Sequence, residues 1–349
     1  MTDWTSPAPP LADWQPFESF LDRHESFVLT THVNPDGDGL GSEVALALYL
    51  RGRGKRAAIL NDGTLPFNYD FLERHHPIET YSPERAASVF AEATGMVILD
   101  TSSVSRLGRL RAHLDTPGLE VAVVDHHLGE VTFASVAVVE KRAAATGELL
   151  YDFLRRHSSA WTPAIAEAAY VALLTDTGSF RFANTDSEAF AMAAHLVALG
   201  VEPERVAARI FRHRHAGRLR FIGTVLRDLQ LNADETIAWL EVRHADMAVF
   251  GIHNEDLEGV VDFPRTLPGV HVVALFTETE NGKVKVSLRS DGLVNVMELA
   301  ARFGGGGHRV AAGALISGSL AEVRGKVLEA VTGALAEDAS GSEATGARS

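Results

Sequence analysis

Short apolar runs alternate with helical patterns through the first half of the chain. Three runs of strand length, Phe27–Thr30, Met96–Leu99 and Val121–Val124, are each followed by polar or acidic residues. Strands that alternate with helices are typical of a parallel sheet with helices on both faces. Ligands of such sheets bind beyond the carboxyl ends of the strands. The pattern therefore predicts an α/β domain with its functional residues at that edge.

A helical pattern without a polar face predicts a buried helix later in this half. The pattern spans Ala164–Leu174, is apolar almost throughout, and ends at Thr175-Asp176-Thr177-Gly178. Because a helix that is hydrophobic all round is surrounded by protein, we expect it to deliver Asp176 to a site.

The last third of the chain changes to strand patterns. The runs Val270–Glu278 and Lys283–Ser290 are joined by Asn281-Gly282, which is a strong hairpin signal. Helical patterns follow at Val294–Phe303 and Leu320–Ala336, so we expect a second, smaller α/β domain. The active site is expected in the cleft between the two domains. The expected boundaries are a disordered N-terminus at 1–14, a first domain at 15–200, a helical linker at 201–230, a second domain at 231–336 and a disordered tail at 337–349.

Composition narrows the class of protein. The 349 residues are 46% hydrophobic and 22% charged, and no apolar run approaches the roughly 18 residues that cross a bilayer. The absence of cysteine excludes disulfides and thiolate metal sites. With no signal-peptide pattern at the N-terminus, a cytoplasmic protein is expected. The net charge of −14 argues against long nucleic acid as a partner, but it allows a small phosphorylated substrate where bound cations invert the local field.

The segment Thr31–Ser42 follows the first strand and concentrates polar groups. Its proline and glycines predict a strand-to-helix loop rather than regular structure. Two carboxylates spaced two residues apart point to the same side of an extended backbone and repel each other unless a cation neutralises them. Carboxylates with an imidazole suit Mn²⁺, Mg²⁺ or Zn²⁺, whereas a solvent-exposed acidic turn is the alternative. The candidate ligands in this segment are His32, Asp36 and Asp38.

Further polar side chains follow other elements: Asp100 and His126 at strand ends, and Asp176 at a helix end. Each alone has a simpler explanation, because a strand-end acid is often a helix cap and a single histidine often a structural hydrogen bonder. Several acidic side chains at one edge of a sheet would repel one another, and their burial would cost free energy unless a cation neutralised them. Six ligands suit two metals about 4 Å apart that share a carboxylate, and a water held between them would attack phosphorus. Asp100 is the natural bridge. Since His126 and His127 are adjacent, we expect one to bind metal and the other to face substrate or support the ligands.

The second domain carries two features that suit an anion. Gly304–Gly307 lets backbone amides approach an anion closely, and His308 adds a donor. This run lacks the strand-loop-helix context of a dinucleotide fingerprint. Arg289 would clamp a phosphate through two nitrogens. A flexible loop and a surface arginine are the alternatives.

Two other groups of residues have a structural and a functional interpretation. The basic segment Arg212–Arg220 is interpreted as a solvated helix face, and the alternative is a linker whose charges face phosphates. The aromatic side chains Phe180, Phe182 and Phe303 lie near motifs, and we expect them in the core rather than stacked on a base.

Taken together, the motifs closely resemble those of the DHH phosphoesterase family. The motif that gives the family its name stands here as Asp125-His126-His127, and the first motif as His32-x-x-Pro35-Asp36-x-Asp38-x-x-Gly41-Ser42. Leu99-Asp100 with Arg106-Leu107-Gly108 is similar to the second motif, and Thr175-Asp176-Thr177-Gly178 to the fourth. The glycine run with Ala311-Ala312-Gly313 looks like the substrate motif of the DHH-associated domain. The resemblance covers about residues 15–335.

This resemblance implies a role for each motif residue. It implies a dinuclear Mn²⁺ centre, with Mg²⁺ or Co²⁺ as alternatives, whose ligands are His32, Asp36, Asp38, Asp100, His126 and Asp176. It implies that Asp125 and His127 support the ligands or act in catalysis together with Asp100. It also implies that substrate is held by Arg106, Arg289, Gly305, Gly306, Gly307 and His308.

The subfamily that is most similar in length and domain pairing is the nanoRNase, an oligoribonuclease that also dephosphorylates 3′-phosphoadenosine 5′-phosphate (pAp). The resemblance therefore implies a cytoplasmic, homodimeric hydrolase that degrades very short RNA, such as pApA and pGpG, to nucleoside 5′-monophosphates. A cyclic di-AMP phosphodiesterase and a dedicated pAp phosphatase stay open. A RecJ-like DNA exonuclease is disfavoured by the acidic charge, a DHH-type pyrophosphatase by the glycine–His motif, and a non-catalytic nucleotide sensor by the complete ligand set.

Overall fold

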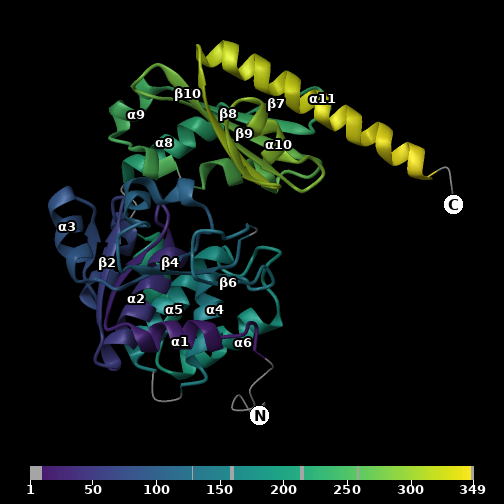
Figure 1. The fold of residues 1–349 in the computed structure, drawn as a ribbon. Coiled ribbons are helices and arrows are strands. Elements are labelled where there is room, and N and C mark those ends of the chain that lie inside the picture. The colour runs from purple at the N-terminus through teal and green to yellow at the C-terminus, as the bar shows by residue number, and fades with distance from the viewer. Residues whose placement is uncertain (1–9, 128, 158–160, 213–215, 258, 347–349) are drawn as a thin grey trace. The chain divides into compact units, whose positions relative to one another are not determined.

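The computed structural model describes residues 10–127, 129–157, 161–212, 216–257 and 259–346 (Figure 1). The chain divides into two compact units, Met1–His213 and Arg214–Ser349, and each is described by itself. None of the helices in the described ranges combines the length and hydropathy that a membrane span requires.

Six parallel strands form the sheet of the first unit, in the order β3-β2-β1-β4-β5-β6. The central strand β1 pairs with β2 on one side and with β4 on the other, so the strand order reverses between β1 and β4. Such a reversal is the point at which open parallel sheets bind ligands. The strands are β1 (Ser26–Thr30), β2 (Arg56–Asn61), β3 (Ile78–Thr80), β4 (Gly95–Leu99), β5 (Glu120–Asp125) and β6 (Val136–Val139).

Helices cover both faces of this sheet, which confirms the predicted parallel α/β architecture. Successive residues of a strand point to opposite faces. Phe27 and Leu29 of β1 join an apolar cluster with α1, α2, α4 and α5, whereas Val28 joins a second cluster with α3 and η2. The helices, with η for 3-10 helices, are α1 (Gln15–Arg23), α2 (Gly37–Gly52), η1 (Phe67–Arg74), α3 (Pro83–Glu92), η2 (Val104–His113), α4 (Thr146–Leu154), α5 (Pro163–Asp176), α6 (Ser187–Ala198) and α7 (Pro203–Phe211).

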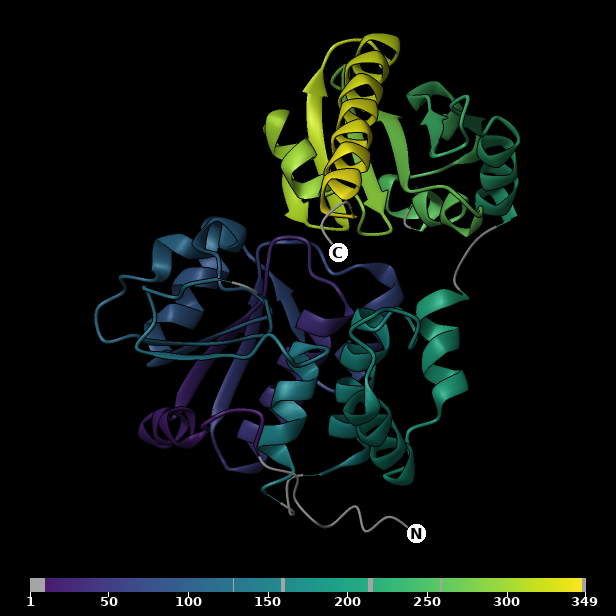
Figure 2. The ribbon, with the colours of Figure 1, turned by 90° about the vertical axis from the view of Figure 1, so that its right-hand side faces the viewer.

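The second unit contains a mixed six-stranded sheet in the order β11-β12-β10-β9-β8-β7. Strands β8 and β9 run parallel, and the other neighbours run antiparallel. Helices α10 and α11 pack on one face, and α8 and α9 pack on the other (Figure 2). The elements are α8 (Ala216–Arg227), β7 (Gln230–Leu231), β8 (Ile237–Val242), α9 (His244–Phe250), η3 (Asn254–Leu257), η4 (Val260–Asp262), η5 (Pro264–Thr266), β9 (Val272–Glu278), β10 (Lys283–Ser290), α10 (Val296–Arg302), β11 (Gly306–His308), β12 (Ala311–Ser317) and α11 (Leu320–Gly346).

The predicted hairpin of the second unit is the β9–β10 pair. Its turn carries Gly282 at φ 69°, a conformation that favours glycine, and its amide donates a hydrogen bond to the carbonyl of Thr279 at 3.0 Å. The expected second α/β domain is thereby confirmed.

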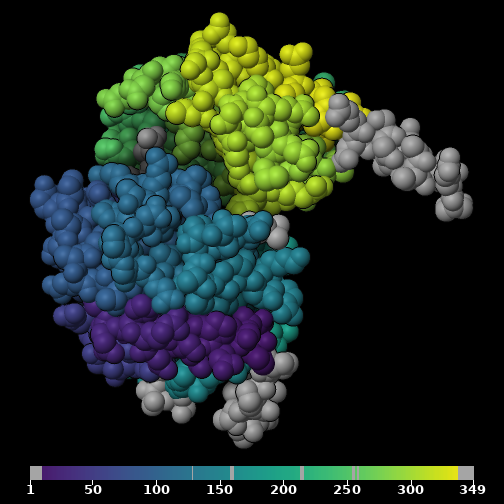
Figure 3. Space-filling model, in the orientation of Figure 1, coloured from purple at the N-terminus to yellow at the C-terminus, as the bar shows by residue number. Residues whose placement is uncertain are grey.

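The ends of the predicted segments differ from the structure. The helices of the predicted linker are divided, because α7 belongs to the first unit and α8 to the second. Trp14 is buried and its Nε1 donates a hydrogen bond to Asp152 Oδ2 at 2.8 Å, so the chain joins the core before residue 15. Helix α1 follows directly and lies in the purple band on the face seen in Figure 3.

At the other end, α11 continues to Gly346 and passes the predicted end at Ala336. Residues 1–9 and 347–349 of the predicted disordered ends lie outside the described residues, as does part of the basic segment Arg212–Arg220.

Candidate metal centre

The carboxyl edge of the first sheet collects acidic and imidazole side chains beside the switch point. They come from the β1–α2 connection and the start of α2, from the ends of β4 and β5, and from the last residue of α5. Groups of these residues have ligand atoms that all lie within 4.8 Å of one another. The structure thus brings together all the predicted metal ligands, namely His32, Asp36, Asp38, Asp100, His126 and Asp176.

Asp100 connects two groups of donors through its two carboxylate oxygens. Its Oδ2 lies 3.5 Å from Nε2 of His32, which in turn lies 3.5 Å from Oδ2 of Asp36. Its Oδ1 lies 3.6 Å from Nε2 of His126. One carboxylate therefore faces two different histidines, as in a carboxylate that bridges two ions.

His126 is the centre of the second group. Its Nε2 lies 3.7 Å from Oδ2 of Asp38 and 3.5 Å from Oδ2 of Asp176. Ligand atoms that bind a common ion at about 2.1 Å lie about 3.0–3.4 Å apart in octahedral or tetrahedral geometry. The observed separations are close to these values, so a small movement of the side chains would bring all three ligand atoms within bonding distance of one ion.

The protonation of His126 fits a metal ligand. Its Nδ1 donates a hydrogen bond to the carbonyl of Ala143 at 3.2 Å, because a carbonyl can only accept, and this leaves the lone pair on Nε2. That Nε2 is buried and has no hydrogen-bond partner among the described residues. Burial, together with the neighbouring His127, lowers the pKa of His126 to about 4, so the ring is neutral at physiological pH. A neutral imidazole with an unused buried lone pair is suited to binding a cation.

Burial and neighbouring acids disfavour the ionised form of three acids of the centre, Asp38, Asp100 and Asp176. Burial, and then the charge of Asp100 and other acids, raises the pKa of Asp38 well above its usual range. Burial and neighbouring acids act in the same direction on Asp100, and they raise the pKa of Asp176 to about 7. Divalent cations would reverse these shifts, because their charge stabilises the ionised carboxylates.

Two residues at the start of α4 support the acids and were not predicted from the sequence. The amides of Thr146 and Gly147 donate hydrogen bonds to Oδ2 and Oδ1 of Asp38, at 2.7 and 2.8 Å. The hydroxyl of Thr146 donates to Oδ1 of Asp100 at 3.0 Å. A Cβ on Gly147 would overlap that of Ala172, so glycine permits this approach. The available signal was a Thr-Gly pair at the start of a helical pattern, because helix N-termini bind anions.

Asp176 is held by Asn184, which was not predicted from the sequence. The Nδ2 of Asn184 donates to the Oδ2 of Asp176 at 3.3 Å, to its backbone carbonyl at 3.1 Å and to the carbonyl of Ala144 at 2.8 Å. Asn184 lies in a loop without a recognisable pattern, so nothing in the sequence singled it out.

Asp125 and His127 form a pair beside the donor groups. The backbone amide and Nδ1 of His127 both donate to Oδ1 of Asp125, at 3.1 and 2.8 Å, and Ser102 donates to Oδ2. Burial alone would raise the pKa of Asp125, but these hydrogen bonds outweigh it and lower the pKa to about 2. Asp125 is therefore an ionised carboxylate that orients His127.

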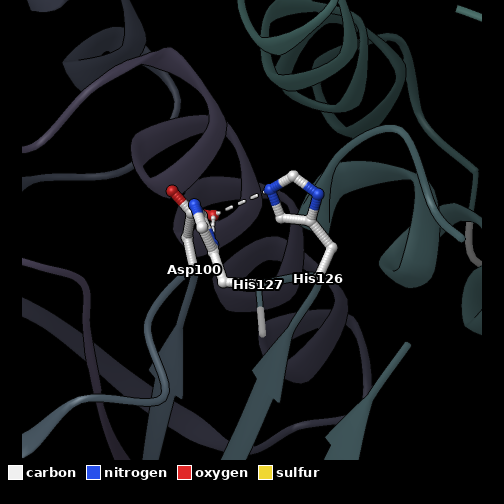
Figure 4. A group of neighbouring side chains, drawn as sticks. All are labelled: Asp100, His126 and His127. Carbon is white, nitrogen blue, oxygen red and sulfur yellow. Dashed lines mark ion pairs between the residues drawn. The ribbon is translucent and has the colours of Figure 1, made fainter. Parts of the chain in front are cut away.

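The rings of the adjacent His126 and His127 lie close together. Their ring centroids are 4.4 Å apart, and His127 Nδ1 lies 3.5 Å from Oδ1 of Asp100. Ligand atoms of Asp100, His126 and His127 form one group within 4.8 Å (Figure 4). What distinguishes the two rings is their partner, because Asp125 accepts from His127 Nδ1 whereas His126 Nε2 has the unused lone pair.

The predicted loop Thr31–Ser42 is wrong in its second half, because α2 begins at Gly37. Asp36 is the N-cap and its Oδ1 accepts from the amides of Asp38 and Gly39 at 3.1 and 3.2 Å. The glycines serve close packing rather than a turn. A Cβ on Gly41 would overlap the backbone of Ala168 in the neighbouring α5, so α2 and α5 approach through the glycine.

The Arg106-Leu107-Gly108 segment supports the first loop. The carbonyl of Arg106 accepts from the amide of Val33 at 2.8 Å. Gly108 has φ 57° and no room for a Cβ beside Asp62, which binds Arg109. The role of the Arg106 side chain in substrate binding stays a prediction.

In the second unit, the second half of the glycine run forms a strand, whereas the alternative interpretation was a flexible loop. Gly306–His308 is β11, an exposed edge strand paired with β12. Arg289 and His308 are both opposite Ala311, so the two side chains lie in one row on one face of the sheet. Nε of Arg289 lies 3.8 Å from Oδ1 of Asp262. That these residues bind substrate stays a prediction.

Two protein-family models match different parts of the chain. Residues 26–173 match the DHH family, N-terminal domain, and residues 243–337 match the DHHA1 domain. The chain belongs to the DHH family and is a metal-dependent phosphoester hydrolase.

Relatives with known names are similar over most of the chain. The bifunctional oligoribonuclease and PAP phosphatase NrnA of Thermus thermophilus is 32% identical over 306 residues, which cover 87% of this chain and 88% of the relative. The protein of the same name from Bacillus subtilis is 24% identical over 302 residues, 85% of this chain and 91% of the relative. A solved structure of an exopolyphosphatase-related protein from Bacteroides fragilis has the same fold, with a TM-score of 0.88, 24% identity and coverage of 95% of this chain and 98% of that one.

Proposed function

We propose that this chain hydrolyses very short oligoribonucleotides to nucleoside 5′-monophosphates and dephosphorylates pAp, with Mn²⁺ as its metal. The relative from Thermus thermophilus, which carries both activities in its name, supports the substrate class. The single observation that best supports a hydrolytic centre is that the two carboxylate oxygens of Asp100 face His32 and His126. The net charge of −14 fits a small substrate better than a long nucleic acid.

We infer that two divalent ions occupy the centre. One would be held by His32, Asp36 and Asp100, and the other by Asp38, Asp100, His126 and Asp176. When bound, such ions supply an activated water and neutralise charge on the phosphoryl group.

In this proposal, the side chains of the protein position the substrate and transfer a proton. Asp125 accepts from His127 Nδ1 and fixes that tautomer, so Nε2 is the nitrogen that would exchange a proton with the reacting phosphate or its leaving group. Arg289 and His308, which share one row of the second sheet, would hold a phosphate of the substrate together with Gly305, Gly306 and Gly307. Arg106 would contribute a further positive charge.

A direct assay tests the proposal. The purified chain with Mn²⁺ is incubated in parallel with pApA, pGpG, pAp and cyclic di-AMP, and products are resolved by anion-exchange chromatography. We expect nucleoside 5′-monophosphate from the dinucleotides and AMP from pAp. Faster turnover of cyclic di-AMP than of the linear dinucleotides would favour a cyclic dinucleotide phosphodiesterase, and no turnover of any of them would refute the proposal.

A matched pair of variants tests whether the activity belongs to this chain or to a contaminating enzyme. Asp100→Asn should abolish turnover of every substrate, whereas Asp115→Asn, which changes a surface acid outside the centre, should leave it unchanged. We also propose that the chain is a homodimer, as the resemblance implies, and light scattering on the same samples tests this. Replacing Mn²⁺ by Mg²⁺, Co²⁺ or Zn²⁺ tests the choice of metal.

A further inference from the structure

The segment after Asp176 has an unusual backbone. Gly178, Ser179 and Phe180 are consecutive residues at φ 55°, 61° and 63°, in the left-handed region that side chains rarely adopt. Thr177 closes this turn, because its carbonyl accepts from the amides of Arg181 and Phe182 at 2.9 and 3.0 Å. The turn therefore returns the chain at Phe182 to the residue that follows Asp176.

Two phenylalanines of this turn have opposite environments. Phe180 packs on the apolar core and stacks on Phe190 with ring centroids 5.3 Å apart. The side chain of Phe182, in contrast, is 48% exposed, so the prediction that it belongs to the core is wrong. Its ring leans on the backbone of Gly178, where any Cβ would overlap it, because the strained turn brings the two together.

The turn is tied directly to the candidate metal centre. Asn184, two residues after Phe182, donates a hydrogen bond to the carboxylate of Asp176 at 3.3 Å. The amide of Thr185 donates to the carbonyl of Phe182 at 3.0 Å. Hydrogen bonds thus hold the backbone on both sides of Phe182, and the loop that follows it is bonded to a carboxylate of the centre. Backbone strain of this kind is common where a functional group must be presented.

We propose that Phe182 is the platform on which a nucleobase of the bound substrate stacks while its phosphate lies at the metal centre. This inference rests on the proposed function. Every nucleobase has a π-face, so an aromatic ring next to a phosphate site binds nucleotides with little dependence on sequence. The larger faces of purines should stack better than those of pyrimidines. Phe182 is therefore a binding residue with a modest preference for purines, and it takes no part in the chemistry.

Steady-state kinetics of Phe182→Ala and Phe182→Trp test the proposal. The substrates are pApA and matched dinucleotides in which one of the two nucleosides is replaced by an abasic ribose. For Phe182→Ala we expect KM for pApA to rise about tenfold with kcat nearly unchanged, and Phe182→Trp to restore it. With the dinucleotide that lacks the stacked base, wild type and variant should have the same KM.

Phe211→Ala is the matched control. Phe211 is 45% exposed on α7, a helix that contributes no residue to the metal centre, and its replacement should leave KM for pApA unchanged. An unchanged KM in Phe182→Ala, or an equal loss on pApA and on both abasic dinucleotides, would overturn the inference. A change in oligomeric state by light scattering, with equal loss on all these substrates, would show instead that the ring is a subunit contact. If wild type cleaves no dinucleotide with Mn²⁺, the proposed function fails; if wild type is active and Phe182→Ala is unaltered, only this inference fails.

Discussion

The hydroxyl of Thr146 donates a hydrogen bond to Oδ1 of Asp100 at 3.0 Å, and the backbone amide of the same residue donates to Oδ2 of Asp38 at 2.7 Å. The start of α4 therefore orients two acids that face His126. Asp100 itself stands at φ 61°, where an aspartate is uncommon, and its amide bonds to the carbonyl of Val124 at 3.1 Å. Its position depends on neighbours that are far away in the sequence.

Thr146→Val tests this support. Valine keeps the shape and the backbone amide but removes the hydroxyl, so Asp100 loses one partner while Asp38 keeps its own. Partners of metal ligands typically affect metal affinity or activity by about 10–100-fold. We expect a loss in this range in kcat/KM and in Mn²⁺ affinity, measured by kinetics at varied Mn²⁺ and by calorimetry.

Thr162→Val is the control for Thr146→Val. Thr162 caps α5 through a hydrogen bond from the amide of Ile165 at 3.2 Å, outside the metal centre. Its loss should lower stability by about 1 kcal/mol and leave Mn²⁺ affinity unchanged. Equal Mn²⁺ affinity in Thr146→Val and wild type would contradict the assigned role of the hydroxyl.

Much of the site was predictable because it follows strand ends. Apolar runs of strand length ending in Asp100 and His126 indicate which side chains share an edge, since parallel strands end on the same side. Thr146 and Asn184 were missed because a residue that supports a ligand through one hydrogen bond has no periodic or compositional signal of its own. The short edge strands β3 and β6 were missed for a similar reason, because each has only a few residues and pairs on one side.

The start of α2 shows a second limit of sequence patterns. Glycines favour turns when considered locally, yet Gly37 and Gly41 lie inside the helix and provide room for Thr175 and Ala168 of α5. Whether these glycines form a turn or allow close helix packing is decided by contacts between segments that are far apart in the chain. Such packing cannot be derived from the local pattern.

Stability without metal should depend on pH. Burial raises the pKa of Glu148 from 4.5 to about 7, so between these values the folded protein keeps a proton that the unfolded chain has released. The folded state is then favoured at low pH and loses up to about 3 kcal/mol as pH rises from about 4.5 to 7. Asp176 acts in the same direction, with a pKa raised from 3.8 to about 7. His126, whose pKa is lowered from 6.5 to about 4, acts in the opposite direction, and the two acids together outweigh it.

Thermal melts of metal-free protein between pH 5 and 8 measure this effect. We expect Tm to fall with rising pH, and Mn²⁺ to raise Tm more at pH 8 than at pH 5, because ions bind ionised carboxylates. Glu148→Gln should reduce the pH dependence of the metal-free protein but leave the increase caused by Mn²⁺. A Tm of metal-free protein that rises over this range would contradict the assigned pKa shifts.

Arg289→Ala tests whether the row of side chains that contains Arg289 and His308 binds substrate. If this arginine binds a phosphate of the substrate, KM for pApA should rise by about tenfold or more, because a charged hydrogen bond is lost. Lys285→Ala is the control, since Lys285 lies on the same face of β10 four residues earlier and is exposed. Similar KM values for Arg289→Ala and Lys285→Ala would remove Arg289 from the substrate site.

Two glycines of α2 should respond oppositely to alanine. A Cβ on Gly41 would overlap the carbonyl of Ala168, whereas a Cβ on Gly52, at the end of the same helix, would meet no atom within 4 Å. Gly41→Ala should therefore lower the free energy of unfolding by about 1–3 kcal/mol, because α2 and α5 would have to separate. Gly52→Ala should raise it by up to about 1 kcal/mol, because alanine is the better helix former. Urea unfolding of both variants measures the difference.

The same two variants should differ in Mn²⁺ binding. Since Asp38 lies on α2 and Asp176 on α5, Gly41→Ala should weaken Mn²⁺ binding while Gly52→Ala should not. Equal Mn²⁺ affinities would show that the spacing of these two helices does not set the geometry of the centre.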